Sequence, residues 1–295
     1  MTTTELLKKV RHIEIKTRGL VNQVFSGEYH SVFKGRGMEF SEVREYQYGD
    51  DIRAIDWNVS ARIGSPFIKI FEEERELTVM LLVDMSRSEQ FGSVEAMKNE
   101  IATEICAVLA FSAIRNNDKV GLIIFTDTIE KFIPPKKGKQ HILRIVRELL
   151  SFQPQSHGTN IKVAMEYLNS VIKKRSIAFF ISDFINTNEK NNYDTVLRVV
   201  SKRHDMIGIT LHDPRERELP KIGLVKMRDA ETGEERWIDT SNIIVQKQFQ
   251  HYWKTHEERL KKLFLTTKVD RIDVRIDRPY IQPLVNFFRM REQRW

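Results

Sequence analysis

The sequence predicts an α/β protein built on a mainly parallel β-sheet, and three observations support this fold class. From residue 77 onward, short apolar runs alternate with helical patterns, which is typical of parallel strands joined by helices. Several of these runs end in Asp, Ser or His, as strands do when they leave a sheet toward a ligand-binding edge. The 295 residues, with 41% hydrophobic and 30% charged content, suffice for one large domain with additions.

The predicted strands are apolar runs of about seven residues. In the first, at 77–83, six of the seven residues are apolar, as burial on both faces of a sheet requires. We expect further strands at 119–125, 175–181 and 205–211, a short edge strand at 130–133 that Pro134 and Pro135 end, and a half-exposed last strand at 271–276. Because parallel strands end at the same edge of a sheet, the polar residues that follow them should lie close together.

Helical periodicity connects these strands. Apolar residues at spacings of three and four predict a helix from Val94 to Val108, capped by Ser93. We expect further helices at about 140–151, 160–171, 193–203, 241–264 and 282–293. Residues 224–227 and 236–238 predict a β-hairpin that rims the ligand-binding edge.

Residues 1–76 have a different pattern from the rest of the chain. Leu6, Val10 and Ile13 predict a first amphipathic helix, but residues 25–70 show turns and short patterns without a βα unit. The sequence therefore predicts an N-terminal accessory segment at 1–76, an α/β domain at 77–276 with the hairpin inserted near 221–240, and a C-terminal helical tail at 277–295.

Oxygen-bearing side chains gather at the predicted ligand-binding edge. Asp84, Ser86 and Ser88 follow the first strand at alternating positions, so an extended turn can point them the same way. Thr159 lies in a loop before a helix and Asp183 follows a strand, so both can reach the same edge. Such hard oxygen ligands suit Mg²⁺ or Mn²⁺. The hydroxyls add no charge, so the ion would keep positions that an acidic group from outside could occupy.

These five positions, in the order Asp-x-Ser-x-Ser, Thr and Asp, resemble the metal-ion-dependent adhesion site of von Willebrand factor A domains, over residues 77–276. Upstream, the segments YGDDIRAIDWNVSAR (48–62) and KIFEEE (69–74) resemble the bacterial family known as domain of unknown function 58. The resemblance implies a three-layer A-domain fold with sheet order 3-2-1-4-5-6 and one antiparallel edge strand. It also implies that the serines and the threonine bind the ion directly, that the first aspartate acts through hydrogen bonds and water, and that MoxR-type AAA+ ATPases are frequent partners.

Asp50, Asp51 and Asp56 form a second group of carboxylates. Such a group can be an acid/base pair or a second metal site, but two arginines and Trp57 lie among these residues. We therefore interpret it as a structural ion-pair network anchored by the tryptophan. Separately, Asp127 ends the second strand and is the additional acid expected nearest the metal.

A Mg²⁺-dependent hydrolase or phosphatase is the alternative function from another class. A phosphatase of the haloacid dehalogenase type also starts from an aspartate at a strand end, but it needs a second carboxylate two residues later, where this chain has Ser86. The sequence contains no Gly-x-Ser-x-Gly, Gly-x-x-x-x-Gly-Lys-Ser/Thr, His-Glu-x-x-His or Cys-x-x-Cys motif. We therefore expect that the protein is not an enzyme.

A nucleic-acid-binding module is the third hypothesis, because the net charge is +7. Residues 131–139 hold four lysines and no acid, but residues 1–75 hold twelve basic and twelve acidic side chains. The basic excess is therefore local and forms no continuous stripe along a helix. We expect a solvated surface or an acidic protein partner, and no nucleic acid.

Composition also predicts where the protein resides. The single cysteine, Cys106, rules out an internal disulfide, and no run approaches the roughly 18 apolar residues of a membrane span. The N-terminus has no apolar core of signal-peptide length. The sequence thus predicts a soluble cytoplasmic protein without membrane insertion.

Its predicted function is a non-catalytic, Mg²⁺- or Mn²⁺-dependent module that binds an acidic residue of a protein partner, as an adaptor or co-chaperone of a MoxR-type AAA+ ATPase.

Overall fold

The computed structural model describes residues 3–24, 38–73, 76–90, 97–156, 158–185, 192–228 and 233–293. Two compact units make up the chain, Met1–Val32 together with Thr78–Trp295, and Phe33–Leu77. We describe each unit by itself. Helix α1 (Thr3–Val24) belongs to the larger unit. The functional boundaries expected at residues 76 and 276 stay a prediction.

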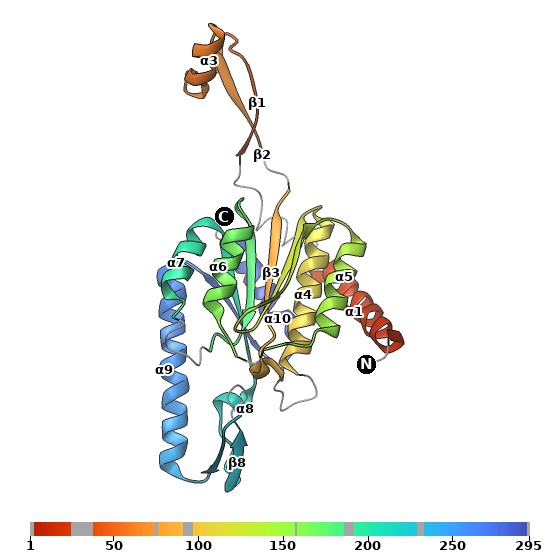
Figure 1. Ribbon diagram of the computed structural model, residues 1–295, viewed down its shortest axis with the longest axis vertical. Helices are drawn as coiled ribbons and strands as arrows, with labels where there is room; N and C mark the ends of the chain where they lie inside the picture. Colours follow the sequence, from red (N-terminus) through yellow and green to blue (C-terminus); the bar gives the residue numbers. More distant parts are fainter. Residues whose placement is uncertain are drawn as a thin grey trace. The chain divides into compact units, whose positions relative to one another are not determined.

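A six-stranded sheet forms the centre of the larger unit (Figure 1). Its strands, in spatial order, are β10 (Asp270–Arg275), β7 (Asp205–His212), β6 (Ile177–Ser182), β3 (Thr78–Asp84), β4 (Lys119–Phe125) and β5 (Ile129–Lys136). All neighbours are parallel except β5, which pairs antiparallel with β4 at the edge. Numbered along the chain within the sheet, the order is 3-2-1-4-5-6, which confirms the expected von Willebrand factor A-like architecture.

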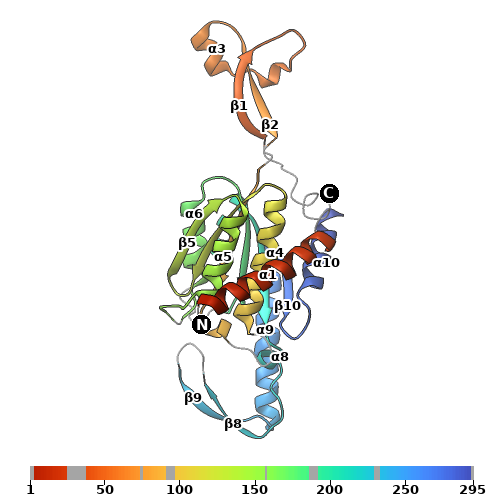
Figure 2. The same cartoon turned by 90° about the vertical axis from the view of Figure 1, so that its right-hand side faces the viewer.

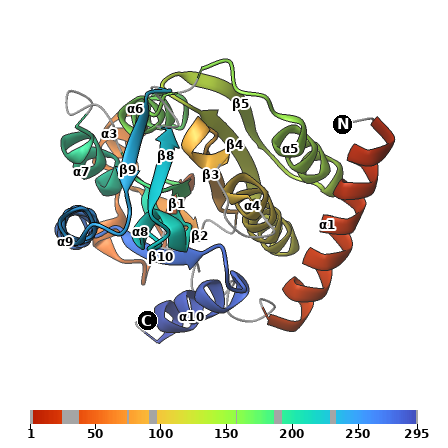
Figure 3. The same cartoon turned by 90° about the horizontal axis from the view of Figure 1, so that it is seen from below.

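Helices cover both faces of this sheet and give three layers (Figure 3). One face carries α6 (Ile161–Val171), α7 (Asp194–Arg203) and α9 (Ile243–Thr267), whose buried side chains form one core with Met80 and Leu82 of β3. The other face carries α4 (Lys98–Arg115), α5 (Lys139–Ser151) and α10 (Ile281–Glu292). Because β3 is covered on both sides, its residues are almost all buried, which explains the nearly continuous apolar run in the sequence.

Two predictions about element ends were wrong. Strand β5 runs through Pro134 and Pro135, because an edge strand needs no N–H on its outer side and the register shifts beside these prolines. Helix α4 begins at Lys98, so Met97 is an exposed N-cap residue instead of part of a buried helical face. The expected cap at Ser93 and the residue after it lie outside the described residues.

Helix α1 packs against α4 and α5, outside the layers of the sheet (Figure 2). Val10 and Ile13 are buried, which confirms the predicted amphipathic helix. At the surface, Lys9 Nζ lies 3.2 Å from Glu100 Oε1 of α4. The first segment of the chain is therefore an added layer of the larger unit.

The predicted hairpin consists of β8 (Leu224–Arg228) and β9 (Glu235–Asp239), which pair antiparallel. The chain enters it from β7 through the short helix α8 (Pro214–Arg217) and returns through α9. In Figure 1 the hairpin lies beyond the edge of the sheet at which β3 ends. Leu224 and Trp237 are each 66% exposed, so the hairpin presents apolar surface at this edge.

The smaller unit is a two-stranded ribbon with short helices at one end. β1 (Met38–Glu45) pairs antiparallel with β2 (Phe67–Glu73), and their connection contains the 3-10 helix η1 (Ile52–Ala54) and the helix α3 (Trp57–Ile63). Both helices begin directly after an aspartate that caps them, Asp51 and Asp56. The acids of this segment thus determine where its helices start.

Helix length bears on the expectation that no segment inserts into a membrane. Helix α9 has 25 residues and carries charged side chains along its length. Among the parts of the chain that the structure describes, no helix combines the length and the apolar character needed to cross a bilayer.

Candidate metal centre

Strand β3 brings Asp84 to the carboxyl edge of the sheet, where its side chain is buried. Its Oδ1 accepts a hydrogen bond from the Ser86 N–H at 2.9 Å, and its Oδ2 accepts one from the Ser182 hydroxyl at 2.8 Å. The first contact shapes the turn that follows the strand, as aspartate side chains commonly do. The orientation of the carboxylate is therefore set by two neighbouring strands, β3 and β6.

Hydroxyl groups line the turn beside Asp84. Ser86 is fully buried, and its Oγ lies 3.0 Å from Ser88 Oγ. Thr159 is also buried, in the loop before α6. The next residue, Asn160, donates its N–H to the carbonyl oxygen of Thr126 at 2.9 Å, at the end of β4. Since β4 is a neighbour of β3, this contact places Thr159 at the same edge as the serines.

Asp183 follows β6, the other neighbour of β3, and is buried as well. Its N–H donates to Glu89 Oε1 at 3.1 Å, and its Oδ1 accepts from the Ile185 N–H at 2.9 Å. The residue between them, Phe184, has a φ of 57°, in the left-handed region that side chains of this size rarely adopt. Backbone outliers of this kind cluster at functional sites.

Glu89 is a member of this group that the sequence analysis did not identify. It lies in the 3-10 helix η2 (Arg87–Gln90) and is 1% exposed. One carboxylate oxygen from each of Asp84, Glu89 and Asp183 lies within 4.8 Å of the other two. Oε2 of Glu89 is buried and has no hydrogen-bond partner among the residues that the structure describes. Burying such an oxygen is costly unless a cation or water satisfies it, so these three carboxylates could hold a metal ion.

A fully buried lysine compensates part of the negative charge. Lys98 is 0% exposed, and its Nζ lies 2.8 Å from Glu216 Oε1, 3.2 Å from Asp183 Oδ2 and 4.0 Å from Glu89 Oε1. Oε2 of Glu216 accepts the Asp213 N–H at 2.9 Å, in the capping box that begins α8. Lys98 therefore connects the candidate centre to the helix that leads into the hairpin.

Burial and repulsion determine the protonation of these groups. Burial, followed by repulsion from Asp183, raises the pKa of Asp84 to about 7. Burial also raises the pKa of Glu89 well above its usual range, although Lys98 opposes this. Burial alone would lower the pKa of Lys98, but the surrounding carboxylates raise it overall. Glu89, Asp183 and Glu216 thus share the Lys98 ammonium, while Asp84 has no ion pair with it among the described residues. A bound divalent cation would favour the ionised forms of the carboxylates whose pKa values burial raises.

The structure brings some of the predicted site residues into direct contact and others only to the same edge of the sheet. Asp84 contacts the backbone of Ser86, and Ser86 contacts Ser88, while Asp183 reaches the group through Glu89. Thr159 lies at the same edge. Asp127 is exposed and accepts a hydrogen bond from the Thr126 hydroxyl at 3.3 Å, so the additional acid of the cluster is Glu89 and not Asp127.

The second group of carboxylates, in the smaller unit, has structural contacts. Asp50 forms two hydrogen bonds with the Arg44 guanidinium, at 2.8 and 2.9 Å. Asp51 caps η1 and Asp56 caps α3, and Lys69 Nζ lies 3.4 Å from Asp56 Oδ2. The Arg44 guanidinium lowers the pKa of Asp50, which keeps this carboxylate ionised. These acids are satisfied by neighbours within their own unit.

The expected network is therefore present with different partners. Within the described part of the chain, no ion pair involves Arg53 or Arg62, which lie nearer in sequence to the acids than Lys69 does. Trp57 is 68% exposed and does not anchor the network. The residue of α3 that contacts the ribbon is Ser60, whose Oγ accepts the Phe67 N–H at 2.8 Å. Trp57 is the first residue of this helix.

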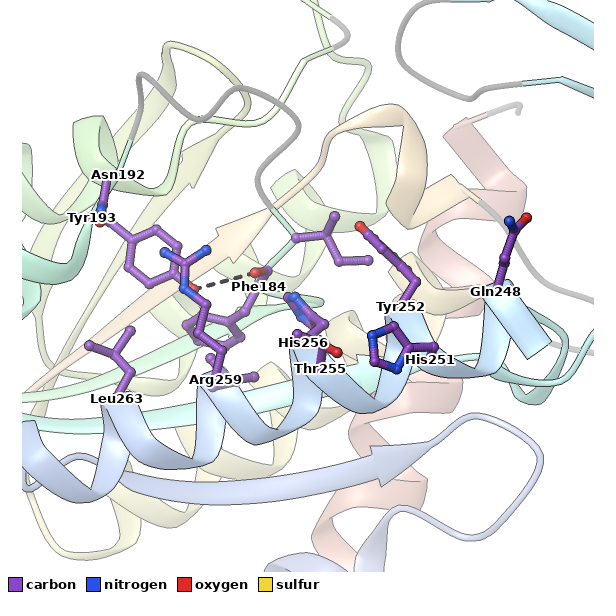
Figure 4. Close-up of a pocket in the computed structure, with 12 residues that line it drawn as sticks. Phe184, Asn192, Tyr193, Gln248, His251, Tyr252, Thr255, His256, Arg259 and Leu263 are labelled. Atoms are coloured by element: carbon purple, nitrogen blue, oxygen red, sulfur yellow. Dashed lines mark hydrogen bonds between the residues drawn. The ribbon is translucent and has the colours of Figure 1, made fainter. Parts of the chain in front are cut away.

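A pocket of about 730 Å³ lies beside the candidate centre (Figure 4). Its lining comes from α9 and from residues on both sides of the connection between β6 and α7. Phe184 and Ile185, which directly follow Asp183 in the chain, form part of this lining. The pocket therefore adjoins the segment that directly follows Asp183, while Asp183 itself lines a small neighbouring cavity.

Comparison with known proteins gives a family match and distant structural likenesses. The model of a family described as "Protein of unknown function DUF58" matches residues 42–259. An uncharacterized protein of Mycobacterium tuberculosis is 28% identical over 291 residues, which cover 98% of this chain and 90% of the relative. Among solved structures, BatB from Bacteroides thetaiotaomicron has 16% identity and a TM-score of 0.49, with 74% of this chain and 99% of BatB covered. Proximal thread matrix protein 1 from the mussel byssus, solved with a zinc-occupied MIDAS motif, has 16% identity and a TM-score of 0.38, with 46% of this chain and 38% of that protein covered.

Proposed function

The chain belongs to the DUF58 family, whose description assigns no activity, and from its candidate metal centre we propose that it is a metal-dependent protein-interaction module without catalytic activity. The observation that carries this proposal is the buried carboxylate cluster at the end of β3 and β6, in which Glu89 Oε2 has no hydrogen-bond partner within the described ranges. An excess of buried carboxylates over cations favours the uptake of a further cation. A divalent ion bound there would satisfy the unpaired oxygen.

The oxygen chemistry of the site favours Mg²⁺ or Mn²⁺. We assign Ser86, Ser88 and Thr159 as direct ligands, with Asp84 and Asp183 in support, because hydroxyls and carboxylates are the donors that these hard cations prefer. When bound, the ion supplies an electrophilic site for an oxygen atom from outside the chain. A glutamate or aspartate of a partner protein is the simplest source of that oxygen.

We propose that the partner is a MoxR-type AAA+ ATPase and that the pair works in the cytoplasm. The family resemblance suggests this partner, and the hairpin gives physical support for a protein interface. Leu224 and Trp237 are exposed at the edge of the sheet that carries the centre. Exposed apolar side chains beside a charged contact are typical of a protein-binding face.

The chemistry of the centre argues against hydrolysis. The position two residues after Asp84, where a phosphatase of this kind needs a second carboxylate, is Ser86, and this side chain is fully buried. Lys98 is enclosed by carboxylates that keep it protonated, so it cannot act as a base. A Mg²⁺-dependent hydrolase remains the alternative, and a phosphatase screen in the presence of Mg²⁺ tests it.

The lysine-rich segment 131–139 gives little support to a nucleic-acid partner. Lys131 and Lys139 form ion pairs with Glu148 and Glu14. Neutralised lysines contribute less to phosphate binding, whose strength depends on the number of free cationic contacts. We therefore expect that any binding to duplex DNA disappears at physiological salt.

Calorimetry and partner capture test the proposal. Mg²⁺ should bind to the wild-type protein and not to the double variant Ser86→Ala/Thr159→Ala, and equal binding would show that the site is wrongly assigned. A MoxR-type ATPase from the same organism should be captured by wild type in Mg²⁺, and capture should be lost in EDTA and with Ser88→Ala. Thr128→Ala, an exposed hydroxyl at the end of the neighbouring strand, serves as the matched control. Retained capture in EDTA would refute the metal-dependent mechanism.

A further inference from the structure

We propose that the pocket beside α9 is a second subsite of the interaction face, and that it takes a bulky apolar side chain next to the partner's metal-binding acid. The recognised element would be an acidic residue flanked by an aromatic or long aliphatic one. This inference rests on the proposed function, because the acid is held by the metal. It adds a sequence preference that metal binding alone does not provide.

The position of the pocket supports a single continuous face. Phe184 and Ile185 line the pocket and follow Asp183 directly. His256 and Leu260 of α9 line this pocket and also a small neighbouring cavity that Asp183 borders. Because adjacent residues of a bound segment are only about 3.8 Å apart between Cα atoms, one segment can reach both places.

The inner wall of the pocket is apolar and held in place by packing. Phe184 and Tyr193 are buried, and the Tyr193 hydroxyl donates to the carbonyl oxygen of Phe184 at 3.3 Å. The Phe184 ring meets the Phe264 ring edge to face at 5.1 Å between centroids. At Gly208 a Cβ atom would lie 2.6 Å from the Phe264 ring, so the glycine makes room for this packing. A fixed apolar wall favours binding of an apolar side chain.

The rim of the pocket favours an acidic segment. Figure 4 shows Arg259, His251 and Tyr252 projecting from α9 around the opening. None of the described residues that line the pocket is acidic. Within the described part of the chain, His256 Nε2 is buried and has no hydrogen-bond partner, so it can contact a polar group of a bound chain. Arg259 is the cation among the described lining residues; its side chain is 62% exposed, and its Nη2 lies 3.4 Å from Asp194 Oδ1. An exposed cation over an apolar wall fits an acidic residue beside a bulky apolar one.

Short peptides provide defined probes for this subsite. We would titrate the acetylated, amidated tripeptides Phe-Asp-Phe, Ala-Asp-Ala and Phe-Asn-Phe into the Mg²⁺-loaded protein and follow amide chemical shifts by NMR. Phe-Asp-Phe should bind about ten-fold more tightly than Ala-Asp-Ala, because its ring is buried in the pocket. Phe-Asn-Phe should bind more weakly than Phe-Asp-Phe, and EDTA should abolish that difference.

Two variants on α9 distinguish an effect on the pocket from a general effect of a new side chain on this helix. Thr255→Trp fills the pocket from an exposed position on its rim, and Lys254→Trp adds the same side chain at an exposed position that does not line it. Thr255→Trp should remove the preference for Phe-Asp-Phe over Ala-Asp-Ala while Mg²⁺ binding stays unchanged. Lys254→Trp should leave both unchanged.

The outcomes distinguish this inference from the proposed function. If Ala-Asp-Ala binds in a Mg²⁺-dependent way and as tightly as Phe-Asp-Phe, the subsite is wrong and the metal-dependent function stands. If Phe-Asp-Phe and Phe-Asn-Phe bind equally with and without Mg²⁺, the pocket takes apolar side chains independently of the metal, and both proposals in their present form fail. If no peptide changes the shifts of residues around the pocket, the inference is refuted.

Discussion

Two groups of acidic residues, one in each unit of the molecule, differ in what surrounds them. In the smaller unit, Asp50, Asp51 and Asp56 each accept backbone N–H groups, and two of them pair with a basic side chain near the surface. In the larger unit, Asp84, Glu89 and Asp183 are buried, and Glu89 and Asp183 share the ammonium of Lys98. The first group stands out in the sequence as clustered acids, and two members of the second, Asp84 and Asp183, stand out as acids at strand ends. Burial without full compensation, and not clustering itself, makes the second group a candidate metal centre.

The largest expected difference concerns the basic partner of each group. Lys98→Met removes the ammonium that contacts these buried carboxylates, so we expect the free energy of unfolding of the larger unit to fall by roughly 3–5 kcal/mol in EDTA. Lys69→Met removes a pair whose lysine side chain is 41% exposed, and we expect a loss below about 1 kcal/mol in the smaller unit. Hydrogen exchange under mild denaturant measures the two units separately. Equal losses would remove the distinction between the groups.

The second-largest expected difference is the effect of Mg²⁺ on the stability of the two units. At about one hundred times its Kd, the ion should stabilise the larger unit by about 2.7 kcal/mol, because it binds only the folded site. Thermal melts with and without Mg²⁺ measure this effect. The double variant Ser86→Ala/Thr159→Ala should lose the stabilisation, whereas Asp51→Asn, in the smaller unit, should keep it. A stabilisation that survives in the double variant would place the ion elsewhere.

A change of pH near neutrality, in metal-free protein, should affect the stability of the larger unit and not that of the smaller one. Folding raises the pKa of Asp84 from 3.8 to about 7, so the folded state binds a proton more tightly. Stability from this group is therefore present at low pH and lost as the pH rises through about 7, with a change of about 1.4 kcal/mol between about pH 8 and pH 6. Denaturant unfolding in EDTA across this range measures it, and Asp84→Asn should flatten the profile.

The same pH range should leave the smaller unit unaffected. The Arg44 guanidinium lowers the pKa of Asp50 below 3.8, so its contribution to stability is lost only when the pH falls through that lowered value. Hydrogen exchange of the α3 amides, corrected for the intrinsic pH dependence of exchange, provides the comparison. A matching pH response in α3 would contradict the assignment of separate environments.

The smallest expected effect concerns a helix cap. Asp56→Ala removes the acceptor for the N–H groups of Asn58 and Val59, so α3 should lose about 1 kcal/mol of local stability. Asp56→Asn keeps an acceptor and should lose less, which separates the cap from the ion pair with Lys69. Hydrogen exchange in α3 measures both variants. If Asp56→Ala instead weakened Mg²⁺ binding, this acid would belong to a metal site.

The regular part of the fold could be predicted because burial imposes a period on the sequence. The run at 77–83 became β3, and the pattern that includes Val10 and Ile13 became α1. The strand end predicted at Pro134 was wrong, because proline is tolerated in a strand at the edge of a sheet. The residues of one strand do not show whether that strand lies at an edge. The start of α4 was also predicted wrongly. Its first residue, Lys98, contacts carboxylates that are distant in the sequence, and such contacts leave no local pattern.

The candidate site could be predicted only in part. Asp84, Ser86 and Ser88 stand in a short motif, and Asp183 follows a recognisable strand. Glu89 and Lys98 carry no local signal, because their role depends on side chains that meet only in the folded chain. A signal did exist for Glu216, because the Asp-Pro-x-Glu spacing at 213–216 is typical of a capping box, although it gives no indication of the contact with Lys98.

The bridge from Lys98 to Glu216 constrains how this chain can change over generations. The two residues are 118 positions apart, and Asp183 and Glu89 also lie within 4.0 Å of the Lys98 ammonium. Loss of Lys98 would leave these buried carboxylates without the ammonium that they share, whereas loss of Glu216 would leave Lys98 paired with Asp183. Lineages should therefore replace Glu216 more readily than Lys98. Because Glu216 also forms the capping box that begins α8, a substitution at this position would affect both the contact with Lys98 and the helix that leads into the hairpin.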